Sequence, residues 1–221
     1  MATKAMVTKK SARPVPAPDG PPVRARILEA AFAAFAERGF ADTSTLEIAT
    51  RARASKRELY AEFGSKQDML VACIRQRAER LKLPLDLPEI TDRATLERAL
   101  VAFGTQLMRE VSDPAVVAVF RIAIGETVRA PEVAHTLNDV AIAASREALR
   151  EIMRRAIDAR LLGGGAPEMA EHFFGLLWGN RMLGLLLNVA ERPGAREIAA
   201  RAASAASAFL LAYPAPVSGK R

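Results

Sequence analysis

Hydroxyl and basic side chains are concentrated between residues 43 and 66, and their types suit binding to a nucleic acid. Lysine and arginine bind phosphate or the edges of bases, and serine and threonine hydroxyls bind phosphate oxygens. Two runs carry most of these groups, Thr43-Ser44-Thr45 and Ser55-Lys56-Arg57, and they are followed by Tyr60 and Lys66. Both runs lie where a helix is expected to begin, and the free backbone N–H groups of a helix start also attract anions.

The residue types that most often carry catalysis or bind metals do not form a recognisable group. The histidines, His135 and His172, lack the spacing of metal ligands, and Cys73 is the only cysteine. The glycines at 163–165 neither follow a strand nor precede the Gly-Lys-Ser/Thr of a phosphate-binding loop. We therefore expect no enzyme activity, no metal and no cofactor.

The positive charge is confined to one part of the chain. Residues 1–82 hold 16 Lys and Arg against 9 Asp and Glu, whereas residues 83–221 hold 16 of each, so the first part carries the whole net charge of +7. A basic module joined to a neutral one favours a polyanionic partner, because neutralising phosphates releases counterions. The alternative is a basic tail that only aids solubility.

Composition predicts an all-α protein. Half of the residues are hydrophobic but only 5% are aromatic, and Ala, Leu and Arg recur throughout, which suits helices better than strands. A single cysteine and an N-terminus without an apolar core favour a cytoplasmic location. Phe173 to Ala190 is apolar, but Asn180 and Arg181 near its centre favour a buried helix over a membrane span.

Three serines mark helix starts in the basic part of the chain. A proline-rich arm over residues 1–22 precedes a helix from about Val23 to Arg38, which is expected to stop at Gly39. Ser44, Ser55 and Ser65 are each followed three residues later by Glu or Asp, the pattern of a capping box. The first two boxes are 11 residues apart, which requires two short helices and a tight turn, the helix-turn-helix arrangement.

Long helical patterns follow a break at residues 83–90. Helices are expected at about 92–111, 114–128, 131–161, 167–190 and 194–212, with Pro114, Pro131 and Pro167 near their starts. The helix at 167–190 is apolar all round, so one face must meet something beyond its own domain. Gly175, Gly179 and the alanines of the last helix permit close approach, which favours a two-fold homodimer through these two helices.

The segment from Arg24 to Leu70 resembles the N-terminal DNA-binding domain of the TetR family of repressors. The points of resemblance keep the family's spacing and are Ile27-Leu28, Ala30-Ala31, Gly39-Phe40, Thr43-Ser44, Ile48-Ala49, Ser55-Lys56, Leu59-Tyr60, Phe63 and Ser65-Lys66. They cover about a fifth of the chain. The resemblance implies that a helix from Lys56 to Phe63 enters the major groove of duplex DNA and that a dimer reads a pseudo-palindromic operator.

The residues expected to contact DNA are identified from this resemblance and from the types of their side chains. They are Thr43, Ser44, Thr45, Arg53, Ser55, Lys56, Arg57, Glu58, Tyr60 and Lys66. Arg53 stands where the family often has glycine in the turn, and Glu62 where it often has histidine. Glu58 and Glu62 also place negative charge on the helix that approaches DNA, and Glu58 is expected to act mainly as the cap partner of Ser55.

The second half of the chain is expected to bind a small-molecule effector of unknown identity, as similar regulators do. The residues expected to line its cavity are Phe103, Leu107, Met108, Phe120, Phe174, Trp178 and Met182, although for any single one of them a plain core position is favoured. The polar side chains expected to orient the effector in the cavity are those of Arg121, Glu126, Asn138 or Asn180.

These observations predict an all-α transcriptional repressor with four segments. They are a flexible basic arm (1–22), a three-helix helix-turn-helix DNA-binding domain (23–82), a larger helical ligand-binding and dimerisation domain (83–213) and a flexible tail (214–221). The protein would bind double-stranded DNA as a homodimer and leave its operator when an effector binds. The alternatives are a non-specific architectural DNA-binding protein and, with less support, an enzyme or membrane-surface protein.

Overall fold

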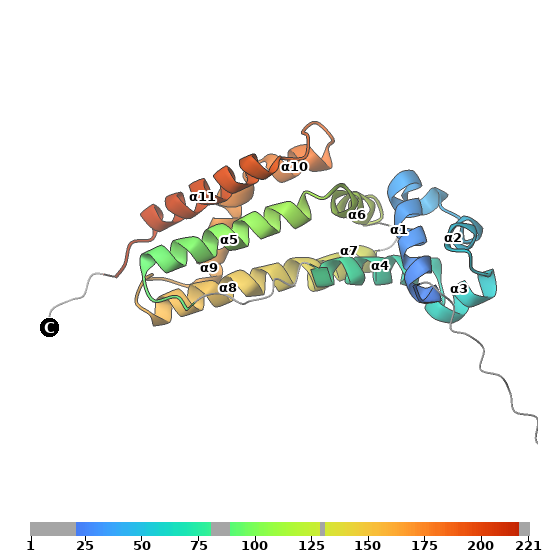
Figure 1. Ribbon diagram of the computed structural model, residues 1–221, viewed down its shortest axis with the longest axis horizontal. Helices are drawn as coiled ribbons and strands as arrows, with labels where there is room; N and C mark the ends of the chain where they lie inside the picture. The colour runs from blue at the N-terminus through green and yellow to red at the C-terminus, as the bar shows by residue number, and fades with distance from the viewer. Residues whose placement is uncertain (1–20, 81–88, 129–130, 217–221) are drawn as a thin grey trace, which may run out of the picture.

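The computed structural model describes residues 21–80, 89–128 and 131–216, which are helical and contain no strand (Figure 1). The predicted all-α class is confirmed. Helices α1 to α3 form one end of the molecule, and α4 runs from them alongside α7 (Figure 1). The other helices form the longer body. The predicted arm, up to residue 20, the break up to residue 88 and the tail from residue 217 lie outside the described residues.

The N-terminal end consists of four helices around one apolar core. They are α1 (Val23–Asp42), α2 (Thr45–Ala52), α3 (Lys56–Phe63) and α4 (Lys66–Arg80). The helical backbone of α1 is interrupted at Gly39 (φ 82°, ψ 168°), where the sequence predicts its end, and Phe40 then packs against Phe35 with ring centroids 5.4 Å apart. The largest buried side chains here are Ile27, Phe35, Ile48, Leu59, Met69, Leu70 and Ile74.

In the described residues from 89 onward, the body contains eight further elements. They are α5 (Arg93–Val111), α6 (Pro114–Gly125), α7 (Pro131–Leu137), the π-helical turn η1 (Asn138–Ile142), α8 (Ala143–Asp158), α9 (Ala166–Trp178), α10 (Arg181–Leu186) and α11 (Ala195–Ala212). Helix α5 packs against α8 and α11, and α9 packs against both α8 and α11 (Figure 1). Gly104 lies where α5 packs closely against α9 and α11. A Cβ at this position would crowd its neighbours, because it would lie 3.1 Å from Leu177 Cδ1 and 3.3 Å from Ala202 Cβ.

Two predicted helices are broken in the structure. The one expected at 131–161 is interrupted by η1. The one expected at 167–190 ends at Gly179, whose backbone leaves the helical region (φ 50°, ψ −127°), and Arg201 on α11 donates to the carbonyls of Leu176 at 2.6 Å and Leu177 at 2.9 Å. These bonds satisfy carbonyls that the end of a helix leaves without an intrahelical partner. Among the described residues, no helix is both long and apolar enough to cross a membrane.

The N-terminal helices contact the body directly. Helix α4 packs against α7 and η1, and α1 packs against α6. Gln67 Nε2 on α4 donates to Glu132 Oε1 on α7 at 2.7 Å. Helices α6 and α7, with the turn η1, are therefore the parts of the body that touch the N-terminal helices α1 and α4.

Candidate nucleic-acid interface and ligand cavity

Serine side chains begin α2 and α3 as predicted. Ser55 forms a complete capping box, because its hydroxyl accepts from the backbone N–H of Glu58 at 3.1 Å and its own N–H donates to Glu58 Oε2 at 2.8 Å. Ser44 accepts from the N–H of Glu47 at 3.1 Å, but its capping box is incomplete because the Glu47 carboxylate pairs with Arg38 and Arg51. The predicted cap role of Glu58 is therefore observed, and its carboxylate is occupied by Ser55.

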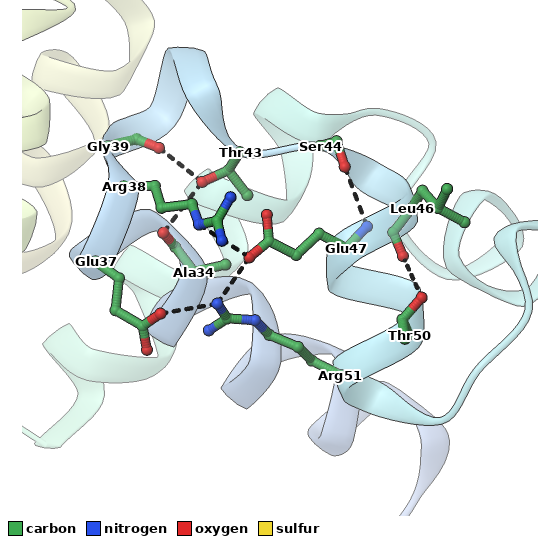
Figure 2. A network of polar contacts seen from close by, with 10 residues as sticks. All are labelled: Ala34, Glu37, Arg38, Gly39, Thr43, Ser44, Leu46, Glu47, Thr50 and Arg51. Carbon is green, nitrogen blue, oxygen red and sulfur yellow. Dashed lines mark hydrogen bonds and ion pairs between the residues drawn. The ribbon is translucent and has the colours of Figure 1, made fainter.

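An ion network holds α2 against α1 (Figure 2). Glu47 pairs with Arg38 at 3.3 Å and with Arg51 at 2.7 Å, and Arg51 also reaches Glu37 at 2.8 Å. Arg51 lowers the pKa of the Glu37 carboxyl by donating a hydrogen bond to it. Arg38 and Arg51 are thus neutralised by acidic side chains of the same network.

Thr43 has a structural role that differs from its predicted contact with DNA. Thr43 is 2% exposed, and its hydroxyl shares its one proton between the carbonyls of Gly39, at 2.7 Å, and Ala34, at 3.1 Å (Figure 2). This hydroxyl stabilises the turn between α1 and α2 and is directed away from solvent.

Lys66 likewise acts inside the fold. Its Nζ donates to the carbonyls of Phe40 at 2.8 Å, Thr43 at 3.0 Å and Ala41 at 3.3 Å, and it lies 4.5 Å from the centroid of the Phe40 ring. An ammonium group has three N–H donors. All three are used at the end of α1, which leaves none for the phosphate contact that the sequence predicts.

The two acidic residues of α3 have partners of different kinds. Glu62 Oε2 lies 3.5 Å from Nη1 of Arg24, which also donates to the Glu62 carbonyl at 3.0 Å and stacks over the Phe63 ring at 4.5 Å. The backbone N–H of Ser55, donating to the Glu58 carboxylate, lowers the pKa of Glu58. Glu62 is therefore paired with Arg24, a distant partner that no local pattern indicates, whereas Glu58 is held by neutral donors and keeps its negative charge at the start of α3.

Arg53 closes the turn between α2 and α3 in the left-handed conformation (φ 50°, ψ 47°). A residue with a Cβ pays about 1–2 kcal/mol for this conformation. The turn is held by the N–H of Ala54, which donates to Ala49 at 2.9 Å, and by Arg26, whose Nε donates to the carbonyl of Ala52 at 3.1 Å. The side chain of Arg53 remains exposed.

Three of the four basic groups that remain free lie at the turn and at the start of α3. Among the described side chains of residues 21–77, Arg53, Lys56 and Arg57, together with Arg75 on α4, are exposed and make no ion pair or hydrogen bond with another described residue. Tyr60 is 47% exposed, and its OH lies 3.3 Å from Thr45 Oγ1 at the start of α2. This surface combines free cations, hydroxyls and two helix N-termini, which suits phosphates and base edges.

A second candidate site is a cavity of about 240 Å³ in the body. Its lining residues are Leu107, Val111, Phe120, Ile142, Ser145, Arg146, Glu171, Phe174, Trp178 and Met182. Five of the seven predicted residues are among them. Phe103 and Met108, which are 2% and 0% exposed, lie in the core instead.

The polar groups of the cavity differ from those predicted. Arg146 and Glu171 form an ion pair at 3.1 Å on the lining. Arg121, which was expected to orient a ligand, instead donates to the carbonyls of Leu185 at 2.6 Å and Leu186 at 3.0 Å. It thereby ties α6 to α10. Among the described residues, no three His, Cys, Asp or Glu side chains could hold a metal ion.

Apolar side chains are exposed along α10 and α11 and just beyond α10. Leu183 and Leu187 are 57% and 63% exposed, and Val189 and Leu211 are 78% and 84% exposed. The exposed positions of α11 include Ala199, Ala200, Ala203, Ser204 and Ser207, all of them small. A small-residue surface flanked by exposed leucines suits close packing of helices from a second chain.

Two family models match the chain. Residues 27–73 match "Bacterial regulatory proteins, tetR family", and residues 98–215 match "AefR-like transcriptional repressor, C-terminal domain". No curated protein matches the chain.

Solved structures of similar fold are transcriptional regulators. The flavonoid-responsive regulator FrrA is 28% identical with a TM-score of 0.72, over 87% of this chain and 97% of its own. A TetR-family regulator from Pseudomonas syringae pv. tomato is 27% identical with a TM-score of 0.70, over 87% and 97%. A TetR regulator from Agrobacterium tumefaciens is 24% identical with a TM-score of 0.77, over 88% and 95%.

Proposed function

Because this chain belongs to the TetR family of transcriptional regulators, which are not enzymes, we propose that it is a sequence-specific repressor released from its operator by a small effector. One observation carries this proposal. Within residues 21–77, most described basic side chains have partners inside the fold. Of the four that have none, Arg53, Lys56 and Arg57 lie together at the turn and the start of α3, and Arg75 lies on α4. A regulator of this kind acts on DNA in the cytoplasm.

In the proposed complex, α3 lies in the major groove. Arg57 and Lys56 contact base edges, since the first residues of a recognition helix reach the bases. Around it, phosphates are contacted by Ser44, Thr45, Arg53 and Tyr60. Ser55, which was also expected to contact DNA, uses both its N–H and its hydroxyl as donors to Glu58 and acts as the cap of α3. Glu58 positions the start of α3 through Ser55, and Lys66 and Thr43 hold the turn after α1.

The cavity is proposed to hold a small aromatic effector. Phe120, Phe174 and Trp178 supply aromatic walls, and the Arg146–Glu171 pair supplies a donor and an acceptor for a hydroxyl or carboxylate. The volume of about 240 Å³ is below the roughly 300–1,000 Å³ of sites for drug-sized ligands, which favours one small ring system. FrrA, a relative of similar fold, is described as flavonoid-responsive.

Release would act through α6. Phe120 on α6 lines the cavity, α6 packs against α1, and Arg121 ties α6 to α10. If a ligand binds the protein more tightly with α6 in one position than in another, it shifts the equilibrium between the DNA-binding and the released states. The difference between the two affinities sets the size of that shift.

The proposed division places the DNA-binding domain at 23–82 and the ligand-binding and dimerisation domain at 83–213, with α9 to α11 as the two-fold contact.

Selection of bound sequences from random DNA tests the operator proposal. We expect one enriched, two-fold symmetric sequence, bound by two chains. The triple variant Arg53→Ala/Lys56→Ala/Arg57→Ala should keep its helical spectrum and enrich nothing. A wild type that enriches no sequence and binds all duplexes alike would instead be a non-specific architectural protein.

Tryptophan fluorescence tests the cavity. Trp178 is the only tryptophan and lines the cavity, so a small aromatic acid or phenol bound there should change its emission. The same compound should release the selected operator. Arg146→Met should weaken both effects, and a variant that responds like wild type would reject this pair as the polar anchor.

A further inference from the structure

Leu46 is an exposed leucine at the start of α2. It is 58% exposed, and within residues 21–77 only Leu46 and Tyr60 are large hydrophobic side chains that remain exposed. The neighbouring apolar positions Ile48 and Ala49 are 0% and 2% exposed in the core. Single exposed leucines are common on protein surfaces. The significance of this one lies in where the fold holds it.

The first turn of α2 is fixed on both sides. Ser44 caps the helix, and the Thr50 hydroxyl donates to the Leu46 carbonyl at 2.8 Å. Glu47 points the other way, into the ion network with Arg38 and Arg51, while the Leu46 side chain points away from that network (Figure 2). Leu46 is therefore a rigidly held, exposed apolar side chain, and the neighbouring Glu47 carboxylate does not cover it.

Leu46 also adjoins the surface that approaches DNA. Its neighbour Thr45 lies 3.3 Å from the hydroxyl of Tyr60 on α3, so the start of α2 and the exposed face of α3 meet. The free cations Lys56 and Arg57 lie on the first turn of α3. A duplex that engages α3 in its major groove would bring its base edges close to the first turn of α2.

We infer that Leu46 is a specificity-determining residue that contacts the 5-methyl group of a thymine in each half-site. The inference rests on the proposed function, since it requires an operator. The thymine methyl is the apolar feature that the major groove offers among its hydrogen-bonding groups. Leu46 has no hydrogen-bonding side-chain group, so it favours thymine over cytosine by apolar contact alone.

The expected effect of removing the methyl is small and measurable. Burial of one methyl-sized group corresponds to about a fourfold change in affinity per half-site. The loss should occur at one thymine position per half-site and should disappear when Leu46 is shortened. It should be independent of salt, because no phosphate contact changes.

The experiment replaces each thymine of the selected operator by deoxyuridine, one symmetric pair at a time. Dissociation constants are measured by fluorescence anisotropy for wild type, Leu46→Ala and Ile124→Ala. Ile124 is a matched control because it is also 58% exposed but lies on α6. Equal melting temperatures for the three proteins establish that all are folded.

Wild type and Ile124→Ala should lose about fourfold per half-site at one thymine pair, and Leu46→Ala should lose nothing there. If Leu46→Ala shows the same uracil profile as wild type, the inference is overturned while the proposed function stands. If selection yields no operator, the proposed function fails, and this inference fails with it.

Discussion

Lys66→Met should destabilise the protein without changing how it engages phosphates. The substitution keeps most of the apolar stem and removes the ammonium group from three carbonyls at the end of α1. Hydrogen bonds to a charged group contribute about 1.5–3 kcal/mol each when well formed, and an exposed cation–π contact about 0.5–1 kcal/mol. The carbonyl of Ala41 belongs to an exposed bond and can be rehydrated.

Counting the two partly buried bonds and discounting them for water access, we expect a loss of about 2–4 kcal/mol. In a chain of this size that lowers the melting temperature by roughly 5–12 °C. Circular dichroism melts measure the loss, and anisotropy titrations over several salt concentrations measure the salt slope at a temperature where the variant is folded.

Lys56→Met is the matched control. Lys56 is exposed and makes no bond with another described residue, so its loss should leave the melting temperature unchanged and weaken DNA binding. The reasoning about Lys66 is refuted if Lys66→Met melts like wild type and its salt slope falls by about 0.9 for each chain, the signature of a lost phosphate contact.

Four further outcomes follow from the structure. Arg57→Ala should weaken operator binding by about 1–3 kcal/mol per half-site and relax the preference at one base position, which a base-substitution series on the operator would reveal. Leu187→Asp places a carboxylate on the proposed two-fold contact, so light scattering should find monomers; an unchanged dimer would remove Leu187 from that contact. Burial raises the pKa of the Cys73 thiol to about 12, so a maleimide should label the folded protein far more slowly than the unfolded one at neutral pH. The bond from Ser55 lowers the pKa of Glu58, so its stabilising effect is present above the ordinary carboxyl range and is lost as pH falls through the lowered value. The melting temperature of wild type should therefore fall more than that of Glu58→Gln between roughly pH 5 and pH 3, and parallel curves would contradict this role.

Features that depend on neighbouring residues were predictable from the sequence. Ser55 and Glu58 are three residues apart, and their capping box appears as expected. The interruption of α1 at Gly39 and the start of α6 at Pro114 also follow from single residues with restricted or unusual backbone preferences. These signals were sufficient to place α2 and α3, and with them the candidate interface.

Features that depend on distant partners were not predictable in this way. Lys66 has the residue type of a phosphate contact, but its carbonyl partners lie 23 to 26 residues earlier in the chain. Arg24 neutralises Glu62 across 38 residues. The end of α9 is satisfied by Arg201, and no local pattern announces that contact. The apolar lining of the cavity was easier to predict than its Arg146–Glu171 pair, because helical periodicity identifies apolar faces but not which charges meet.

Sequence-specific reading of duplex DNA by α3 is measured by the ratio of two dissociation constants. The selected operator and a scrambled duplex of equal length and composition are titrated with wild type at the same salt concentration, near physiological. We expect the operator to bind two chains at least about a thousandfold more tightly than the scrambled duplex. Equal affinity for the two duplexes would contradict it.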